Sequence, residues 1–339
     1  MDSISGFLDK INSNIILRDY EIPDPGEDEV TVMQHYTGVC FRDILTQQGF
    51  FPRVSLPIIP GHEIGGTVVA TGKNVTEFKK GDRVASLIYV PCGKCSYCLS
   101  GNENLCPNKK SFGETLNGGY SKYVNVNKNS LVKIEEDVPD EAIPIAACVT
   151  GMIVHAIKKV GKIEKGNYVL ITGAGGGVGS NAIQIVRALG GIPIAETSSK
   201  WKDEELYKLG AEYVVHADDD YNKDIKKITG DGVDIALEDV GIATFNKTLR
   251  SLKTGGRMVV IGNLKPDPVS LPLGLIILKG NSIKGSISST REDLKTALEL
   301  NARGLKPIIG KKIRIDGINQ AYEDMLNKKI FGRVLIDFS

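Results

Sequence analysis

The segment Tyr168-Val-Leu-Ile-Thr172, continued by Gly173-Ala-Gly-Gly-Gly-Val-Gly179, determines the fold that we expect for this chain. An apolar run of strand length leads into a glycine loop, and a helical pattern begins at Ser180. In this context a glycine loop predicts a dinucleotide site, because backbone N–H groups and the helix N-terminus bind a pyrophosphate. A simple turn is the alternative. The residues expected to contact the dinucleotide are Gly173, Ala174, Gly176, Gly177, Val178 and Gly179.

Strands and helices alternate on both sides of this loop. Strands are predicted at 192–197, 233–238 and 257–262, and helices at 141–159, 180–189, 203–209 and 245–252. Such alternation is typical of right-handed βαβ units around a parallel sheet. We therefore expect residues 146–280 to form a doubly wound α/β domain.

The chain before residue 146 has a different pattern. Short alternating apolar runs are separated by Pro23, Pro25, Gly26 and later glycines, which indicates strands and turns. We expect an antiparallel, barrel-like β domain there. Residues 281–339, with helices at 291–301 and 317–327 and a strand at 333–337, are expected to rejoin it. The fold class is therefore α/β plus all-β.

The charge balance of the 339 residues excludes some partners. Lys and Arg number 42 and Asp and Glu 41, a net charge of +1. Nothing therefore attracts the whole molecule to nucleic acid or to an anionic membrane. No apolar run approaches the roughly 18 residues of a membrane span, and the N-terminus lacks a signal-peptide pattern. We expect a cytoplasmic protein.

Four of the six cysteines lie close together in the segment 91–107. Cys92, Cys95, Cys98 and Cys106 follow the spacing C-x2-C-x2-C-x7-C. Two-residue gaps let thiolates converge on one ion, and a fourth sulfur completes the tetrahedron of a structural zinc site. Four free thiols, a redox pair or an iron–sulfur cluster are the alternatives.

The end of the strand 192–197 bears on the choice of nicotinamide cofactor. An acidic residue about 20 residues after the loop accepts from the ribose 2′-hydroxyl and would repel a 2′-phosphate. Thr197 stands at this position, and Ser198, Ser199 and Lys200 follow as donors, which favours NADP(H) over NAD(H). A register shift of one residue would place Glu196 there and reverse the prediction.

A second group of metal-binding residues occurs in the β domain. Cys40 and His62 are suitable ligands for a catalytic zinc ion, and Asp43 could accept from the second ring nitrogen of His62. Cys and His at this separation are a weak signal alone, and a histidine with an ordinary polar partner is the alternative.

Taken in order, these motifs resemble the zinc-containing alcohol dehydrogenase family of medium-chain dehydrogenases and reductases. The matching segments are Gly38–Asp43, Gly61–Gly66, Gly81–Val84, the four cysteines, Gly118–Tyr123, the glycine loop, Gly255–Arg257 and Gly332–Val334. The resemblance implies a Rossmann sheet inserted into a GroES-like β-barrel domain built from both chain ends. It also implies a homodimer or homotetramer.

The resemblance also implies roles for individual residues. Cys92, Cys95, Cys98 and Cys106 would hold the structural zinc. Cys40 and His62 would bind the catalytic zinc, with Glu63 as a nearby carboxylate. Thr150, Gly262 and Asn263 would contact the cofactor.

Two positions depart from the pattern of the alcohol dehydrogenases. Arg42 replaces the Ser or Thr that relays the alcohol proton. Ala146 occupies the position of the third zinc ligand, and Cys148 comes two residues later. Either the backbone is rearranged so that Cys148 serves, or the second zinc is absent or weakly held.

These departures favour another reaction within the family. Cys40–Asp43, Gly49–Arg53 and Cys148–Met152 resemble the branch that contains archaeal acryloyl-CoA reductases. Such enzymes transfer hydride from NADPH to an activated alkene, so the expected substrate is a small molecule such as a CoA thioester or an enone. Arg42 would stabilise the enolate or bind a phosphorylated substrate, and an ordinary surface arginine is the alternative. A zinc-dependent alcohol or aldehyde dehydrogenase, and a nucleotide-binding protein without turnover, are the alternatives.

Overall fold

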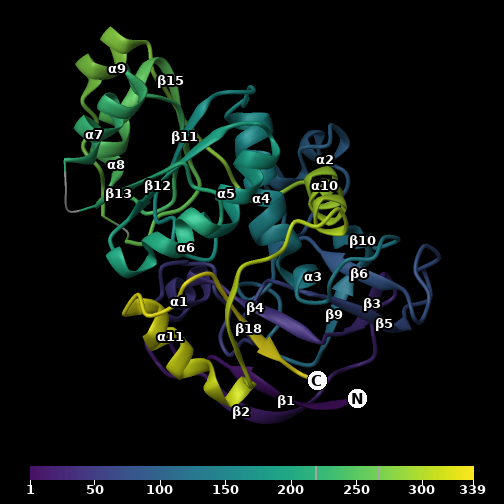
Figure 1. Cartoon of the computed structure of the whole chain (residues 1–339). Coiled ribbons are helices and arrows are strands. Elements are labelled where there is room, and N and C mark those ends of the chain that lie inside the picture. Colours follow the sequence, from purple (N-terminus) through teal and green to yellow (C-terminus); the bar gives the residue numbers. More distant parts are fainter. Residues whose placement is uncertain (218–219, 266) are drawn as a thin grey trace. The chain divides into compact units, whose positions relative to one another are not determined.

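A computed structural model describes residues 1–217, 220–265 and 267–339 (Figure 1). The chain forms two compact units, which we call the first unit (Met1–Met152 with Ser288–Ser339) and the second unit (Ile153–Ile287). Both boundaries lie a few residues after the expected ones. The first of them falls within a continuous helix at 142–160, so no loop marks it in the sequence.

A six-stranded parallel sheet forms the second unit, in the order β13-β12-β11-β14-β15-β16. Its strands are β11 (Tyr168–Ile171), β12 (Ile192–Thr197), β13 (Tyr213–His216), β14 (Val233–Glu238), β15 (Leu252–Val260) and β16 (Ser282–Gly285). The strand order reverses between β11 and β14. In such sheets ligands bind beyond the carboxyl ends of the strands at this point, which is where the glycine loop lies.

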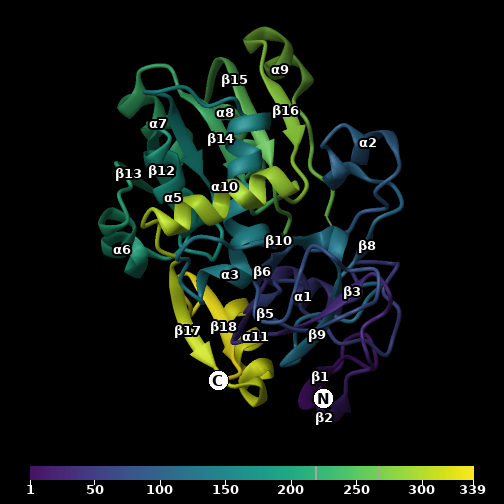
Figure 2. The same ribbon diagram turned by 90° about the vertical axis from the view of Figure 1, so that its right-hand side faces the viewer.

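Helices of the second unit cover this sheet (Figure 2). They are η4 (His155–Val160, a π-helix), α5 (Gly179–Ala188), η5 (Lys200–Lys202), α6 (Asp203–Lys208), α7 (Tyr221–Thr229), α8 (Phe245–Ser251) and α9 (Leu273–Lys279). Tyr221 of α7 and Leu249 of α8 join buried strand residues in one core cluster. The sequence did not predict α7 or α9. In α7 only Tyr221 and Ile225 are buried, and α9 is too uniformly apolar to show a helical period.

Antiparallel strands dominate the first unit, which confirms the expected all-β part. A five-stranded sheet has the order β10-β6-β5-β3-β9, a three-stranded sheet the order β17-β18-β4, and β1-β2 and β7-β8 form ribbons. The strands are β1 (Asp2–Phe7), β2 (Ile16–Glu21), β3 (Glu29–Met33), β4 (Tyr36–Val39), β5 (Gly65–Thr71), β6 (Arg83–Ser86), β7 (Tyr89–Val90), β8 (Lys110–Ser111), β9 (Tyr123–Asn127), β10 (Leu131–Lys133), β17 (Ile309–Ile313) and β18 (Arg333–Asp337). Since β18 pairs with β4, the two ends of the chain build one unit.

Short helices complete the first unit. They are α1 (Phe41–Gln47), α2 (Ser96–Leu99), η1 (Glu103–Leu105), η2 (Lys128–Ser130), α3 (Ala142–Ile145), η3 (Ala146–Gly151, a π-helix), the first residue of α4 (Met152–Val154), α10 (Arg291–Ala302), η6 (Ile315–Gly317) and α11 (Ile318–Leu326). The sequence did not predict α1, which carries part of the candidate active site.

One helix corrects the expectation that no apolar segment reaches the length of a membrane span. Among the described residues, Ala142–Val160 alone is long and apolar enough to cross a membrane by length and composition. Its most apolar stretch is 83% buried inside the protein, as in the core helix of a globular fold.

Candidate active site and metal centres

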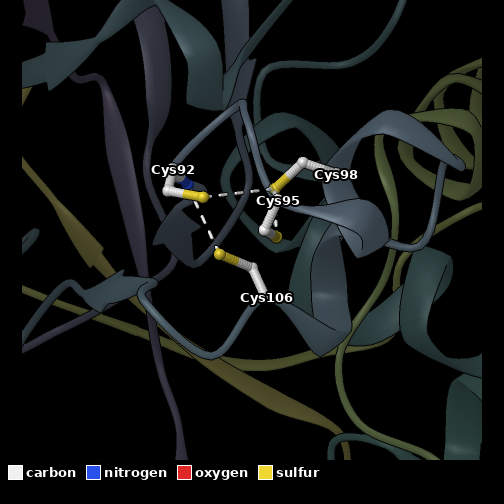
Figure 3. A group of neighbouring side chains, drawn as sticks. All are labelled: Cys92, Cys95, Cys98 and Cys106. Carbon is white, nitrogen blue, oxygen red and sulfur yellow. Dashed lines mark hydrogen bonds between the residues drawn. The ribbon is translucent and has the colours of Figure 1, made fainter.

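The four cysteines of the segment 91–107, which we call the cysteine lobe, converge on one point (Figure 3). The Sγ atoms of Cys95 and Cys98 lie 3.5 Å apart, and those of Cys92 and Cys98 lie 3.9 Å apart. All four lie within 4.8 Å of one another. Zinc–sulfur bonds of about 2.3 Å in a tetrahedron place sulfur atoms about 3.8 Å apart. The lobe therefore fits a closed zinc site.

Two thiols of the cysteine lobe have opposite pKa shifts. Backbone N–H groups of Lys94 and Cys95 lower the pKa of Cys92 to about 6. Burial, together with a hydrogen bond involving Cys95, raises the pKa of Cys98 to about 12. The first thiol is therefore ready to bind a cation near neutral pH, whereas the second must lose a proton when a metal binds.

Cys40, His62, Glu63 and Cys148 form a second group, which we call the Cys40 cluster. Their ligand atoms lie within 4.8 Å of one another, and His62 Nε2 lies 3.3 Å from Cys148 Sγ. Two sulfurs, one imidazole and one carboxylate are donors that zinc accepts in catalytic sites. The structure thus brings together all four residues predicted for this metal.

The N-terminus of α1 positions Cys40 and His62. Cys40 precedes the helix, and its N–H donates to Asp43 Oδ2 at 2.9 Å. Asp43 Oδ1 lies 2.9 Å from His62 Nδ1, which orients Nε2 toward Cys148. The Tyr120 hydroxyl donates to Asp43 Oδ2 at 3.0 Å and lies 3.1 Å from the Tyr322 hydroxyl. A buried polar network therefore holds the imidazole in place.

A π-helix places Cys148 in the cluster. Residues Ala146–Gly151 are wound more widely than an α-helix, so positions within the segment are rotated relative to the regular spacing. Cys148 thereby reaches His62 although it comes two residues after the position usual in the family, which Ala146 occupies. The backbone is therefore rearranged at Cys148, as the first of the two alternatives requires.

Arg333 neutralises Glu63. Its Nε donates to Glu63 Oε2 at 3.1 Å, its Nη2 contacts Oε1, and Nη2 also lies 3.8 Å from Cys148 Sγ. Both side chains are buried. A Cβ at Gly38 would overlap the Glu63 carboxylate, so only glycine permits this approach. The Gly332–Val334 motif contains Arg333, but the sequence did not indicate its partner.

The thiols and the imidazole of the cluster are electrostatically coupled. A hydrogen bond from Cys148 and the charge of Arg333 hold the pKa of Cys40 well below its usual value, although burial opposes them. The hydrogen bond to Cys40, together with burial, raises the pKa of Cys148. Burial alone would lower the pKa of His62, but Asp43 raises it. These shifts favour the negative charge on Cys40 over Cys148.

Arg42 lies beside the cluster in an ion pair rather than free at the surface. Its Nη2 donates to Glu114 Oε2 at 2.6 Å, and its guanidinium lies 5.0 Å from the centre of the Phe51 ring. Its positive charge acts on Cys148, whose pKa it lowers against the other effects. The sequence did not indicate Glu114 as its partner, because 72 residues separate the two.

The glycine loop of the second unit has the geometry of a dinucleotide site. Gly173 has a φ of 59°, and the Gly176 N–H donates to its carbonyl at 2.9 Å, which forms the tight turn. A Cβ at Gly179 would lie 2.6 Å from Ala174 Cα, so glycine permits close packing of α5 against the loop. The N-terminus of α5 then lies directly after the loop, where the positive end of the helix dipole favours an anion.

Thr197 is the last residue of β12, and Ser198 and Lys200 come after it. Gly262 and Asn263 follow the carboxyl end of β15. Thr197 is buried, whereas Ser198, Lys200 and Asn263 are exposed. The remaining predicted cofactor residue, Thr150, is buried in the first unit.

The sequence overlooked one lysine at the glycine loop. The buried Lys202 donates from Nζ to the Gly175 carbonyl at 3.0 Å. The two residues before it, Lys200 and Trp201, are exposed, so the sequence pattern indicates a surface segment and gives no sign that Lys202 is buried.

A dinucleotide fold and two clusters of zinc donors in one chain define a class, the zinc-type dehydrogenases and reductases. Residues 26–136 match the alcohol dehydrogenase GroES-like domain, and residues 177–303 match the zinc-binding dehydrogenase domain. The chain belongs to the zinc-containing alcohol dehydrogenase family and is an oxidoreductase. The expected fold, a Rossmann domain together with a GroES-like domain, is confirmed.

Three relatives illustrate the range of this family. The chain is 40% identical to an acryloyl-coenzyme A reductase of Sulfurisphaera tokodaii, over 93% of this chain and 95% of the relative. It is 35% identical to an alcohol dehydrogenase of Geobacillus stearothermophilus, over 94% of each. The crystal structure of AibC superposes with a TM-score of 0.92 and 36% identity, over 99% of this chain and 96% of AibC.

Proposed function

We propose that this protein reduces the C=C bond of acryloyl-CoA or a related enoyl-CoA or enone with NADPH. The observation that carries the proposal is Arg42, a cation beside the Cys40 cluster where an alcohol dehydrogenase has a hydroxyl that relays a proton. A cation there suits a reaction in which negative charge develops on the substrate. The similarity to an acryloyl-coenzyme A reductase supports the same conclusion.

The chemistry divides between the bound groups and the side chains. A nicotinamide, once bound, would supply the hydride for the β-carbon, a bound zinc ion would supply positive charge for the thioester oxygen, and water would supply the proton for the α-carbon. Arg42 adds a fixed positive charge that stabilises the developing enolate. Asp43 keeps His62 in one tautomer and orientation, and Arg333 keeps Glu63 neutralised until the site is filled.

We assign two zinc ions to each chain. The cysteine lobe would hold a structural ion with four thiolates, as its sulfur distances support. Cys40, His62 and Cys148 would hold a catalytic ion, with Glu63 as the carboxylate nearby. The first unit then acts as the catalytic domain and the second unit binds the dinucleotide.

NADP(H) is the proposed cofactor. Glu196 is the acidic residue that could repel a 2′-phosphate. Its carboxylate instead accepts a hydrogen bond from the Gly173 N–H at 2.9 Å. Thr197 follows it, and Ser198 and Lys200 are exposed beyond it as donors. Thr197→Asp should shift the preference toward NADH, with Ser198→Ala as a milder comparison. An unchanged NADPH/NADH ratio of kcat/KM would contradict this assignment.

A zinc-dependent alcohol or aldehyde dehydrogenase is the second candidate, since the Cys40 cluster has the donors of such an enzyme and an alcohol dehydrogenase is among the relatives. Oxidation of NADPH and NADH should be followed in parallel with acryloyl-CoA, simple enones and aldehydes. We expect turnover of the alkenes. Turnover of aldehydes alone would establish the second candidate, and turnover of none would favour a nucleotide-binding protein without catalysis.

The compartment and assembly follow from the same observations. All six cysteines are free thiols, which suits a reducing compartment, and we propose the cytoplasm. Helix α9 exposes Leu273, Ile277 and Leu278, the last of them by 87%, and β16 is an edge strand of the sheet. These features support a homodimer, or a homotetramer built from it.

A further inference from the structure

Two arginines from separate segments share one buried carboxylate. Arg42 of α1 and Arg53 of the following loop pair with opposite oxygens of Glu114, at 2.6 Å and 3.3 Å. The Glu114 side chain is only 4% exposed, whereas that of Arg53 is 62% exposed. Arg42 lies in the Cys40–Asp43 motif and Arg53 in the Gly49–Arg53 motif. Arg53 has no role in the metal or cofactor sites described above.

Positive charge is in excess around Glu114. One guanidinium suffices to neutralise one carboxylate, so the second is surplus to the ion pair. The two guanidinium groups therefore carry one positive charge more than the carboxylate balances, an arrangement that an added anion would neutralise.

The guanidinium groups are held in position before any ligand arrives. The Glu114 carbonyl accepts from the Ser55 N–H at 3.0 Å, which ties the Arg53 loop to the acid. Arg42 stacks on Phe51, and the Phe51 ring packs edge-on against Phe50 at 5.1 Å. Planar, preorganised guanidinium groups are well suited to bind phosphate oxygens in pairs.

The cluster extends from the reaction centre to solvent. Arg42 comes two residues after Cys40, and its charge reaches Cys148, whereas Arg53 faces solvent. A substrate with its reacting end at the Cys40 cluster and a phosphorylated end outside would pass along this series of cations.

We propose that Arg42 and Arg53 form an anion site that binds a phosphate group of a CoA thioester substrate. This inference rests on the proposed function and adds a binding role for the part of the substrate that does not react. Arg53 provides the solvent-facing contact, and Arg42 and Glu114 hold it in place.

The test compares two substrates with the same reacting group. Acryloyl-CoA carries phosphates, and acryloyl-pantetheine lacks them. The wild-type protein should have a KM for acryloyl-CoA at least about tenfold lower, the order expected for one charge-assisted contact. Arg53→Gln should raise the KM for acryloyl-CoA about tenfold and leave the KM values for acryloyl-pantetheine and NADPH unchanged.

A matched control is Arg18→Gln. Arg18 also pairs with a carboxylate, Asp9, and stacks on an aromatic ring, Phe7, but lies elsewhere on the first unit. It should leave every KM unchanged. Adenosine 3′,5′-bisphosphate should compete with acryloyl-CoA at lower concentrations than inorganic phosphate, which distinguishes the CoA end from any free anion.

The outcomes separate the two claims. Equal wild-type KM values for both thioesters would overturn the anion site while leaving the proposed function intact. This comparison uses the wild-type protein alone, so it does not depend on the folding of a variant. A rise in the KM for NADPH in Arg53→Gln, in place of acryloyl-CoA, would also overturn it. Reduction of neither thioester by the wild-type protein would overturn the proposed function, and the anion site with it.

Discussion

Replacing Arg333 with Met should destabilise the first unit strongly. Glu63 is fully buried and Arg333 is 4% exposed, and the guanidinium is the hydrogen-bonding partner of both carboxylate oxygens. Met fills a similar space but leaves the carboxylate without its cation. Removing one partner of a buried ion pair costs about 3–5 kcal/mol, because a charge stays buried without compensation.

The expected loss can be read as a change in melting temperature. For a unit of about 200 residues, each kcal/mol lowers Tm by about 2–4 °C, so Arg333→Met should lower Tm by about 6–20 °C. The loss should also depend on pH. Without Arg333, the fully buried Glu63 carboxylate has no counter-charge, and burial favours its neutral, protonated form. Stability is then retained below the unfolded pKa and is lost as pH rises through the folded pKa. The difference from wild type should therefore be smaller at about pH 5 than at about pH 8.

Urea unfolding and calorimetry of the metal-free protein measure this effect, since a bound zinc ion could replace Arg333 as the counter-charge. Arg187→Met is the control. It breaks an exposed ion pair with Glu212, which is worth about 0–1 kcal/mol. The double variant Glu63→Gln with Arg333→Met should recover part of the loss. If the Arg333→Met variant has the same free energy of unfolding and the same Tm as the Arg187→Met variant at every pH, the reasoning is refuted.

Three further predictions concern the metals and the assembly. Zinc binding to the cysteine lobe should release protons, because the pKa of Cys98 is raised to about 12, and should weaken below about pH 6 as Cys92 protonates. Competition with a coloured chelator across this range measures it, and a pH-independent affinity would contradict it. Cys148→Ala should remove one of two zinc ions per chain in elemental analysis and abolish most activity, whereas Cys98→Ala should remove the other and chiefly lower Tm. Ile277→Asp should shift the protein to monomers in light scattering and lower Tm by the stabilisation that assembly supplies, and an unchanged mass would show that α9 lies outside the interface.

Local sequence patterns predicted the glycine loop, the cysteine lobe and the parallel sheet of this protein. The glycine loop and the cysteine lobe each lie within one short segment, and their chemistry depends on spacing along the chain. The strand before the loop, the helix after it and the convergence of the four sulfurs therefore match the expectation closely. Alternating strands and helices likewise predicted the parallel sheet, since each βαβ unit is itself local.

Contacts between segments far apart in the sequence could not be predicted. Arg333 meets Glu63 across 270 residues, and Tyr120 meets Tyr322 across 202. The sequence around each of these residues does not indicate its partner. Such contacts form only when the first and last parts of the chain come together, as in the pairing of β4 with β18.

The position of Cys148 shows the same limit at short range. The π-helix changes the hydrogen-bond spacing of one turn and therefore the direction of the Cys148 side chain. The sequence by itself thus determined the family fold, the structural zinc donors and the dinucleotide loop. Only the tertiary structure decided which residues complete the Cys40 cluster and that Arg42 and Arg53 share Glu114, because burial and charge pairing arise when distant segments come together.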